Sequence, residues 1–200
     1  MRYIASRLMQ RFFLSSLLIL LVSPVNAAEM LHMEFWEQDN HYYLRSASTI
    51  EAPPELIFNT LLDYQNFYRL SGGIKETRYL EPDADGTPVA FTLVESCVLF
   101  FCRQVKKTER VLVKSDSVIE LEADPERSDF KYLHGRWTIS RKNNHTVLAY
   151  DMEMIPDFWI PPLIGTWALK RKLYHSAMNM AHRIEKLAAS GTALSDFKIE

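Results

Sequence analysis

A run of short strand-like segments that ends in one long amphipathic helix limits the folds open to this 200-residue chain. Segments rich in β-branched, aromatic or alternating apolar residues occupy 74–81, 89–96, 103–113, 118–123, 130–140 and 146–154. Turn-forming residues separate some of them, as at 83–86 and 143–144. Because connections this short join antiparallel neighbours, the pattern predicts an antiparallel sheet.

The predicted helix follows Pro156, Pro161 and Pro162. Its apolar residues recur every three or four positions, as one face of an α-helix requires. Gly191 ends the pattern, and residues 191–200 are interpreted as a C-terminal tail. The apolar positions are Leu169, Leu173, Ala177, Met180, Ile184 and Leu187.

The segment before these strands predicts one more strand and two short helices. Residues 41–50 have strand composition, and Pro53-Pro54-Glu55 suits the first turn of a helix. Residues 63–67 continue into a short second helix or turn. The predicted fold is α+β: a curved antiparallel sheet of about seven strands wrapped around the long C-terminal helix, with two short helices after the first strand. An apolar hollow is expected between the sheet and the helices.

Residues 1–27 have the pattern of a secretory signal peptide. Three arginines precede an apolar run over 12–22, and small or short residues follow at 25–27. The alternative is a membrane anchor, which needs about 20 apolar residues, more than this run supplies. Losing three positive charges lowers the formal charge from −2 to −5, so the mature chain has no general attraction for nucleic acid. Export is expected, to the periplasm or, alternatively, the medium.

Export makes a disulfide the favoured interpretation of Cys97 and Cys102, the only two cysteines. Positions five apart in a single strand point to opposite faces, but across a hairpin tip they lie opposite each other. Two free thiols are the alternative. No metal site is expected, since no histidine lies within the usual ligand spacing of the pair.

Several short motifs, in order, resemble START-like proteins, also called SRPBCC or helix-grip proteins, in the polyketide cyclase and coenzyme Q-binding branch. They lie at 50–58, 63–67, 133–137 and 146–150 and at Pro156, and the resemblance covers about residues 40–189. It implies one helix-grip domain over 28–190 and a cavity for lipids, quinones, sterols or other apolar molecules. A minority of the family are enzymes. The export signal and the cysteine pair depart from the family's pattern.

Apolar residues of the strands and the long helix are the candidates for ligand contact. The alternative is that they form a plain core, and a slip of one residue would exchange the two faces of a strand. The candidates are Phe91, Leu93, Val105, Leu133, Trp137, Ile139, Tyr150, Met152, Met154, Leu169, Leu173 and Met180.

An aromatic segment lies between the last strand and the helix. Phe158, Trp159 and Trp167 stand beside prolines, and a basic cluster follows at 170–172. Such a segment suits transient contact with a membrane surface, or a cavity lid. The alternative is a loop that folds back on the core.

Few polar residues suggest chemistry. Glu95 and Glu109 would form an acid–base pair if both pointed inward; the alternative is two surface carboxylates. His134 and Arg136 share a face opposite Leu133 and Trp137, so they are expected to face solvent. No catalytic residue, metal or cofactor is assigned.

Three functions follow from these patterns. The favoured one is an exported protein that holds a lipid, quinone or other hydrophobic molecule in its cavity, as carrier or sensor. The second is a cyclase, dehydratase or hydrolase that uses the same cavity. The third is an envelope protein that binds a partner through an exposed apolar patch.

Overall fold

The computed structural model describes residues 27–98, 101–143, 145–160 and 165–198. Except for Ala27, the predicted signal peptide lies outside the described residues. The elements follow in the order β1 (Glu29–Gln38), β2 (His41–Ile50), α2 (Pro54–Leu62), η2 (Phe67–Leu70), β3 (Ile74–Tyr79), β4 (Val89–Val98), β5 (Phe101–Ser115), β6 (Val118–Ala123), β7 (Phe130–Lys142), β8 (His145–Pro156), α3 (Gly165–Ser190) and η3 (Leu194–Asp196).

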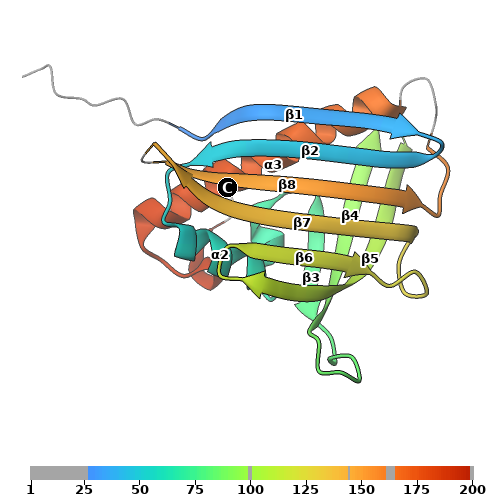
Figure 1. Cartoon of the computed structure of the whole chain (residues 1–200), viewed down its shortest axis with the longest axis horizontal. Coiled ribbons are helices and arrows are strands. Elements are labelled where there is room, and N and C mark those ends of the chain that lie inside the picture. Colours follow the sequence, from blue (N-terminus) through green and yellow to red (C-terminus); the bar gives the residue numbers. More distant parts are fainter. Residues whose placement is uncertain (1–26, 99–100, 144, 161–164, 199–200) are drawn as a thin grey trace, which may run out of the picture.

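The strands form one sheet in the order β1-β2-β8-β7-β6-β5-β4-β3, and every pair is antiparallel. The sheet bends around α3, which runs behind β1, β2 and β8 in Figure 1. α3 contacts β1 and β2, and the short helices α2 and η2 lie at one end. The predicted α+β fold, a curved antiparallel sheet with a long C-terminal helix, is therefore confirmed.

The structure adds an eighth strand, β1, to the seven that the sequence predicts. Its register with β2 is irregular between Met30 and His32, which breaks the period-two pattern that would mark it as a strand. A two-residue turn joins β1 to β2, with positive φ at Asp39 (53°) and Asn40 (63°), as tight hairpins require. β1 pairs only with β2, so it is one edge of the sheet.

The second half of α3 supplies the buried face of the helix, with Met180, Ala181, Ile184 and Leu187 each under 9% exposed. The predicted apolar positions of the first half, Leu169, Leu173 and Ala177, are only partly buried. The helix is thus packed tightly at its C-terminal end and loosely at its N-terminal end.

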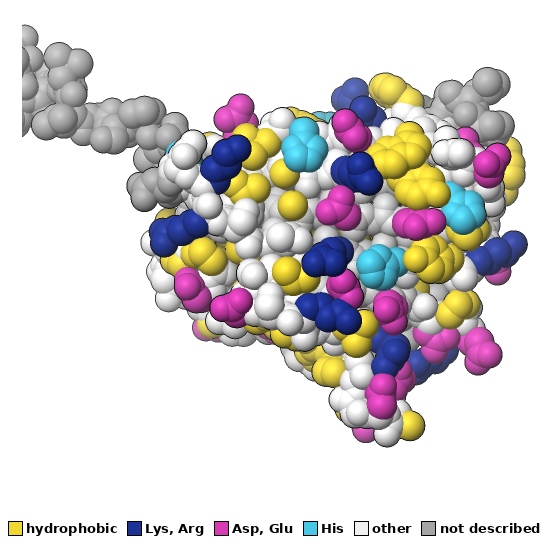
Figure 2. Space-filling model, in the orientation of Figure 1, with side chains coloured by type: hydrophobic (Ala, Val, Ile, Leu, Met, Phe, Trp, Pro, Cys, Tyr) yellow, Lys and Arg dark blue, Asp and Glu magenta, His cyan; other side chains and the backbone are white. Residues whose placement is uncertain are grey.

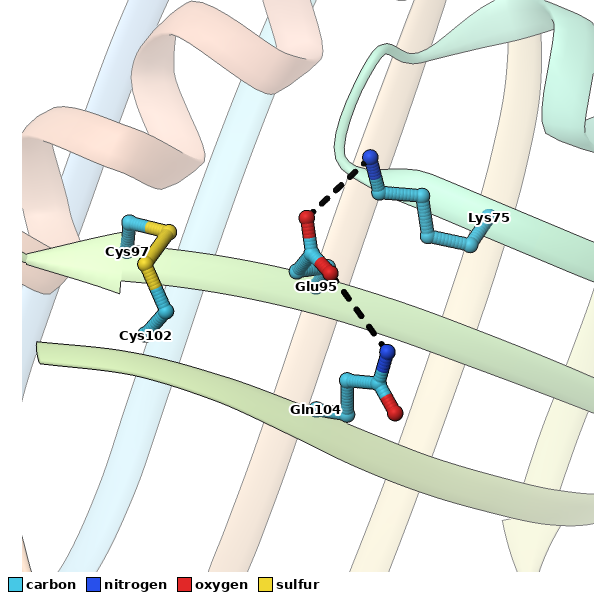
Figure 3. The surroundings of a disulfide bond; sticks show 5 residues. All are labelled: Lys75, Glu95, Cys97, Cys102 and Gln104. Carbon is cyan, nitrogen blue, oxygen red and sulfur yellow. Dashed lines mark hydrogen bonds and ion pairs between the residues drawn. A yellow bond between two sulfur atoms is a disulfide. The ribbon is translucent and has the colours of Figure 1, made fainter.

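The predicted disulfide is confirmed. Cys97 on β4 and Cys102 on β5 are directly opposite in the register and are bonded to each other. Figure 3 shows the bond beside Glu95, whose carboxylate lies 3.1 Å from the Lys75 ammonium and accepts a 3.4 Å hydrogen bond from the Gln104 amide. The disulfide joins the two strands close to the end of their hairpin.

The segment interpreted from the sequence as a tail packs against the domain. Leu194 is 5% exposed and Phe197 contacts the core. The Arg69 guanidinium donates a hydrogen bond of 2.8 Å to the Phe197 carbonyl. Residues 194–197 therefore belong to the folded unit.

The face of the sheet turned away from α3 carries mixed charges, as Figure 2 shows for its β1–β2–β8–β7 part. Arg45 pairs with Asp151 at 3.8 Å, and Arg136 pairs with Glu120 at 3.0 Å. His134 shares this outer face with Arg136, as the sequence predicts. Such interspersed charges are typical of a solvated surface and not of a nucleic-acid site.

Candidate functional site

A cavity of about 160 Å³ lies between the inner face of the sheet and the first half of α3. The register explains how strands far apart in sequence meet there, since directly opposed residues point to the same face. Trp137 is opposite Tyr150, and Tyr150 is opposite Ser46. The lining residues are Met30, Met33, Leu44, Ser46, Ser48, Phe67, Ser71, Ile74, Trp137, Leu148, Tyr150, Leu173, Ser176, Ala177 and Met180.

Trp137 and Tyr150 form an aromatic wall of the cavity. Their rings stack with centroids 4.0 Å apart and planes inclined by 25°. Gly135, the inward-facing neighbour of Trp137 on β7, makes room for this stack. A Cβ at Gly135 would lie 2.7 Å from the Tyr150 hydroxyl oxygen and 3.2 Å from the ring. The glycine therefore allows the Tyr150 ring to lie flat across β7.

The polar groups of the cavity wall are uncharged. Ser46 and Ser48 are buried on β2, and the hydroxyls of Ser71 and Ser176 are hydrogen-bonded to each other at 2.9 Å. Burial and the nearby Glu109 carboxylate raise the pKa of Tyr150, so its hydroxyl stays neutral at physiological pH. The wall is thus apolar with a few hydroxyls, a surface that suits an uncharged group of a ligand.

Behind this wall lies a buried carboxylate, Glu109 on β5, which is 0% exposed. Tyr64 donates a 3.0 Å hydrogen bond to its Oε1, and the Lys107 ammonium lies 2.9 Å from the same atom. Its Oε2 has no hydrogen-bond partner among the described residues. Burial, followed by the charge of Glu109, raises the pKa of Tyr64 well above its usual value.

Glu109 does not line the cavity, because the side chain of Tyr64 lies between it and the lining residue Phe67. Its donor Tyr64 stacks on Phe67, a lining residue, with ring centroids 5.5 Å apart. Glu95 is three positions from the buried, inward-facing Thr92 and therefore lies on the outer face of β4. Hydrogen bonds from Lys75 and Gln104 hold the pKa of Glu95 below the usual value there. The two carboxylates therefore point to opposite faces and form no acid–base pair.

Four of the residues proposed from the sequence line the cavity: Trp137, Tyr150, Leu173 and Met180. Others share the inner face but pack into the core outside the cavity. Ile139 belongs to the core around α2 and α3. Val105, Leu133, Met152, Met154 and Leu169 belong to a second hydrophobic cluster, which contains Phe35, Tyr42 and Phe130. Ligand contact by the four lining residues stays a prediction.

Phe91 and Leu93 need a correction, because the register places them on the outer face of β4. Ala90 lies opposite the inward-facing Glu109, and both are 0% exposed. Phe91, one residue further on, points the other way, where the Arg78 guanidinium lies 4.4 Å above its ring. The alternation that groups Phe91 with Leu93 is real, but it marks the opposite face.

Five of the eleven lining residues that the sequence analysis missed come from the first two strands. Met30 and Met33 lie on β1, which was not predicted, and Leu44, Ser46 and Ser48 lie on β2. A signal for the latter was present, since Leu44, Ser46 and Ser48 alternate along one face. The predicted lining contained only apolar and aromatic residues, so it omitted these serines. The remaining missed residues are Phe67, Ser71, Ile74, Leu148, Ser176 and Ala177.

The aromatic segment divides into a packed part and an exposed part. Phe158 contacts Phe130 edge-on at 6.0 Å and lies under the Arg103 guanidinium at 4.5 Å. Trp159 is 77% exposed and Trp167 is 66% exposed. Phe158 therefore belongs to the second cluster, whereas both indoles face away from the core.

Among the described residues, no group of three or more histidine, cysteine or acidic side chains is placed to hold a metal ion. None of the helices described is both long and apolar enough to cross a membrane.

A sheet bent around one long helix, with an apolar cavity between them, defines a START-like domain, and solved structures share this fold. A START superfamily protein from Mycobacterium smegmatis is 19% identical, covers 72% of this chain and 98% of its own, and has a TM-score of 0.59. A STAR-related lipid transfer protein from Xanthomonas axonopodis is 13% identical, with coverage of 81% and 96% and a TM-score of 0.60. The Zhui aromatase/cyclase from Streptomyces sp. R1128 is 12% identical, with coverage of 79% and 99% and a TM-score of 0.55.

The family model for polyketide cyclase/dehydrase and lipid transport matches residues 50–181, and the chain belongs to this family. The resemblance noted in the sequence is thereby confirmed. A comparison with curated proteins gave no match.

Proposed function

We propose that this chain is an exported binding protein that holds a hydrophobic small molecule, of the lipid or quinone class, in the cavity beside α3. The observation that carries this proposal is the cavity wall, which has apolar and hydroxyl side chains but no Asp, Glu, His, Lys or Arg among the described residues. Burying about 300 Å² of apolar ligand surface at about 25 cal/mol per Å² supplies about 7.5 kcal/mol before the costs of association. Such a wall supports binding as carrier or sensor without chemistry.

Export is part of the proposal and is supported by two features. Residues 1–27 have the pattern of a signal peptide, and the two cysteines are joined in a disulfide. Structural disulfides persist in oxidising compartments such as the bacterial periplasm and are rare in the cytosol. The periplasm is therefore the proposed location.

Organic extraction and mass spectrometry of the mature protein, purified without detergent from its exported compartment, tests the function. We expect one apolar species at close to one molecule per chain. A control is an unrelated exported protein carried through the same purification, since a species recovered from both is a contaminant. Protein without a bound species, combined with no uptake of added hydrophobic probes, would contradict the proposal.

We also propose transient contact with a membrane surface through Trp159 and Trp167. Both indoles are largely exposed, and exposed tryptophans are enriched at the headgroup level of membranes. Lys170 and Arg171 follow on exposed positions of α3 and favour anionic lipid, whereas Lys172 is partly buried. This surface would bring the cavity close to a source of apolar molecules.

Co-sedimentation with anionic liposomes tests this contact. The variant Trp159→Ala/Trp167→Ala is expected to lose at least half of the protein bound by wild type, because the interfacial indoles are removed. The matched control is Trp36→Ala, since Trp36 stacks on Tyr43 at 5.0 Å on the outer face of the sheet. Equal binding by all three proteins, or no binding by wild type, would argue against membrane contact.

A further inference from the structure

A second hollow, a groove of about 580 Å³, lies along the seam between the edge strand β1 and the start of α3. Strand and helix each supply one side of it. From β1 come Met30, His32 and Met33, and from α3 come Trp167, Lys170, Arg171 and Tyr174. Trp167 and Tyr174 are 66% and 41% exposed, so the groove is open to solvent.

The groove and the cavity share a wall made of two methionines. Met30 and Met33 line both hollows. Methionine is unbranched and adapts its shape readily, and β1 is an edge strand with an irregular register next to Met30. This part of the cavity boundary is therefore made of side chains that can adapt their shape to a ligand.

The small volume of the cavity indicates that a bound ligand extends past Met30 and Met33 into the groove. Sites for small molecules commonly measure about 300–1,000 Å³, whereas the cavity alone measures about 160 Å³. A hydrophobic molecule of ordinary size would thus fill the cavity with one end and place its other end in the groove. The chemistry of the groove then decides which end group is accepted.

The groove is basic in a chain whose net charge is −2. Its lining includes Lys170 and Arg171 but no Asp or Glu among the described residues. Neither cation forms an ion pair with a carboxylate of the described residues, and Arg171 lies 5.7 Å from the centroid of the Trp167 ring. Two adjacent cations without a carboxylate partner, beside apolar side chains, complement an anionic head on an apolar chain.

We propose that the ligand is a single-chain anionic amphiphile, such as a long-chain carboxylate. Its chain passes Met30 and Met33 into the cavity, and Lys170 and Arg171 hold its head in the groove. This inference rests on the proposed binding function and adds the ligand's charge and its route into the cavity.

Displacement of a neutral fluorescent naphthylamine probe by decanoate and by decanol, both kept below micellar concentrations, tests the inference. Wild type is expected to bind decanoate more tightly than decanol. Lys170→Gln/Arg171→Gln is expected to lose at least about tenfold in decanoate affinity while decanol affinity changes less than about twofold, since only the head loses its partners. The matched control is Arg141→Gln/Lys142→Gln, the same change of charge on exposed β7 residues outside the groove.

The measured affinities for decanoate, decanol and the probe distinguish a failure of the anionic-ligand proposal from a failure of the proposed binding function. Added salt should weaken decanoate binding to wild type and leave decanol binding unchanged. Equal affinity of wild type for both ligands, or an equal loss of both in the groove variant, would overturn the anionic ligand and leave the cavity function intact. If wild type binds neither decanol nor the naphthylamine probe, the binding function itself fails.

Discussion

Replacing Ala177 by phenylalanine is expected to lower the affinity for a neutral hydrophobic probe by at least about tenfold, which corresponds to about 1.4 kcal/mol. Ala177 lies on α3 and lines the cavity. A phenyl ring attached there would occupy much of the about 160 Å³ that a ligand would otherwise fill. Because the added ring enters existing space, the free energy of unfolding is expected to fall by less than the 1–3 kcal/mol typical of an overpacked core.

The matched control is Ala189→Phe, which adds the same ring at an exposed position further along α3. Titration of the probe into wild type and both variants, with thermal unfolding in parallel, makes the comparison. Binding that is reduced equally in both variants would show that the effect is not caused by filling the cavity. Unchanged binding by a folded Ala177→Phe variant would place the ligand elsewhere.

The second large effect is expected at Lys107. Replacing it by methionine removes the ammonium group 2.9 Å from the fully buried Glu109 carboxylate and keeps most of the apolar stem. Breaking a buried ion pair by removing one partner typically costs about 3–5 kcal/mol, because the other charge stays desolvated. Lys107 retains some solvent contact, so we expect a loss of about 3 kcal/mol in the free energy of unfolding.

Urea unfolding at neutral pH gives the free energy of unfolding of the Lys107→Met variant, which is compared with that of two further variants. Lys114→Met removes a cation that is half-exposed and pairs with Glu120, and it should cost less than about 1 kcal/mol. The double variant Lys107→Met/Glu109→Leu should recover part of the loss, since replacing both members of a buried pair is often nearly neutral. A loss at Lys107 no larger than at Lys114 would show that Glu109 does not depend on the ion pair.

Long, regular patterns were the part of the fold that the sequence predicted well. The apolar repeat of α3 and the alternating residues of β7 match the observed elements because each buries one continuous face. The disulfide could also be predicted, since a hairpin places Cys97 opposite Cys102. The sequence did not predict β1, because its irregular register interrupts the alternation of inward and outward side chains.

The candidate site was harder to predict, because its residues meet only through long-range packing. At the start of β4, Val89 and Ala90 are both 0% exposed, so hydrophobicity does not tell which face is inner. Phe91 and Leu93 were assigned to the wrong face for this reason. Nor could sequence spacing pair Glu109 with Tyr64, which is 45 positions away and reaches it from another element.

The sheet order has a consequence for when the cavity comes into existence during folding. Strands β3 to β8 follow one another as local hairpins, but β2 pairs with β8, so Ser46 lies opposite Tyr150. Glu185 near the end of α3 accepts hydrogen bonds from the backbone of Ala28 and of Glu51, at 3.0 Å each. Pairings over such sequence distances close late and slow the folding of a domain. The hairpin β1–β2 and helix α3 are thus expected to dock last, and a chain truncated before α3 would have neither cavity nor groove.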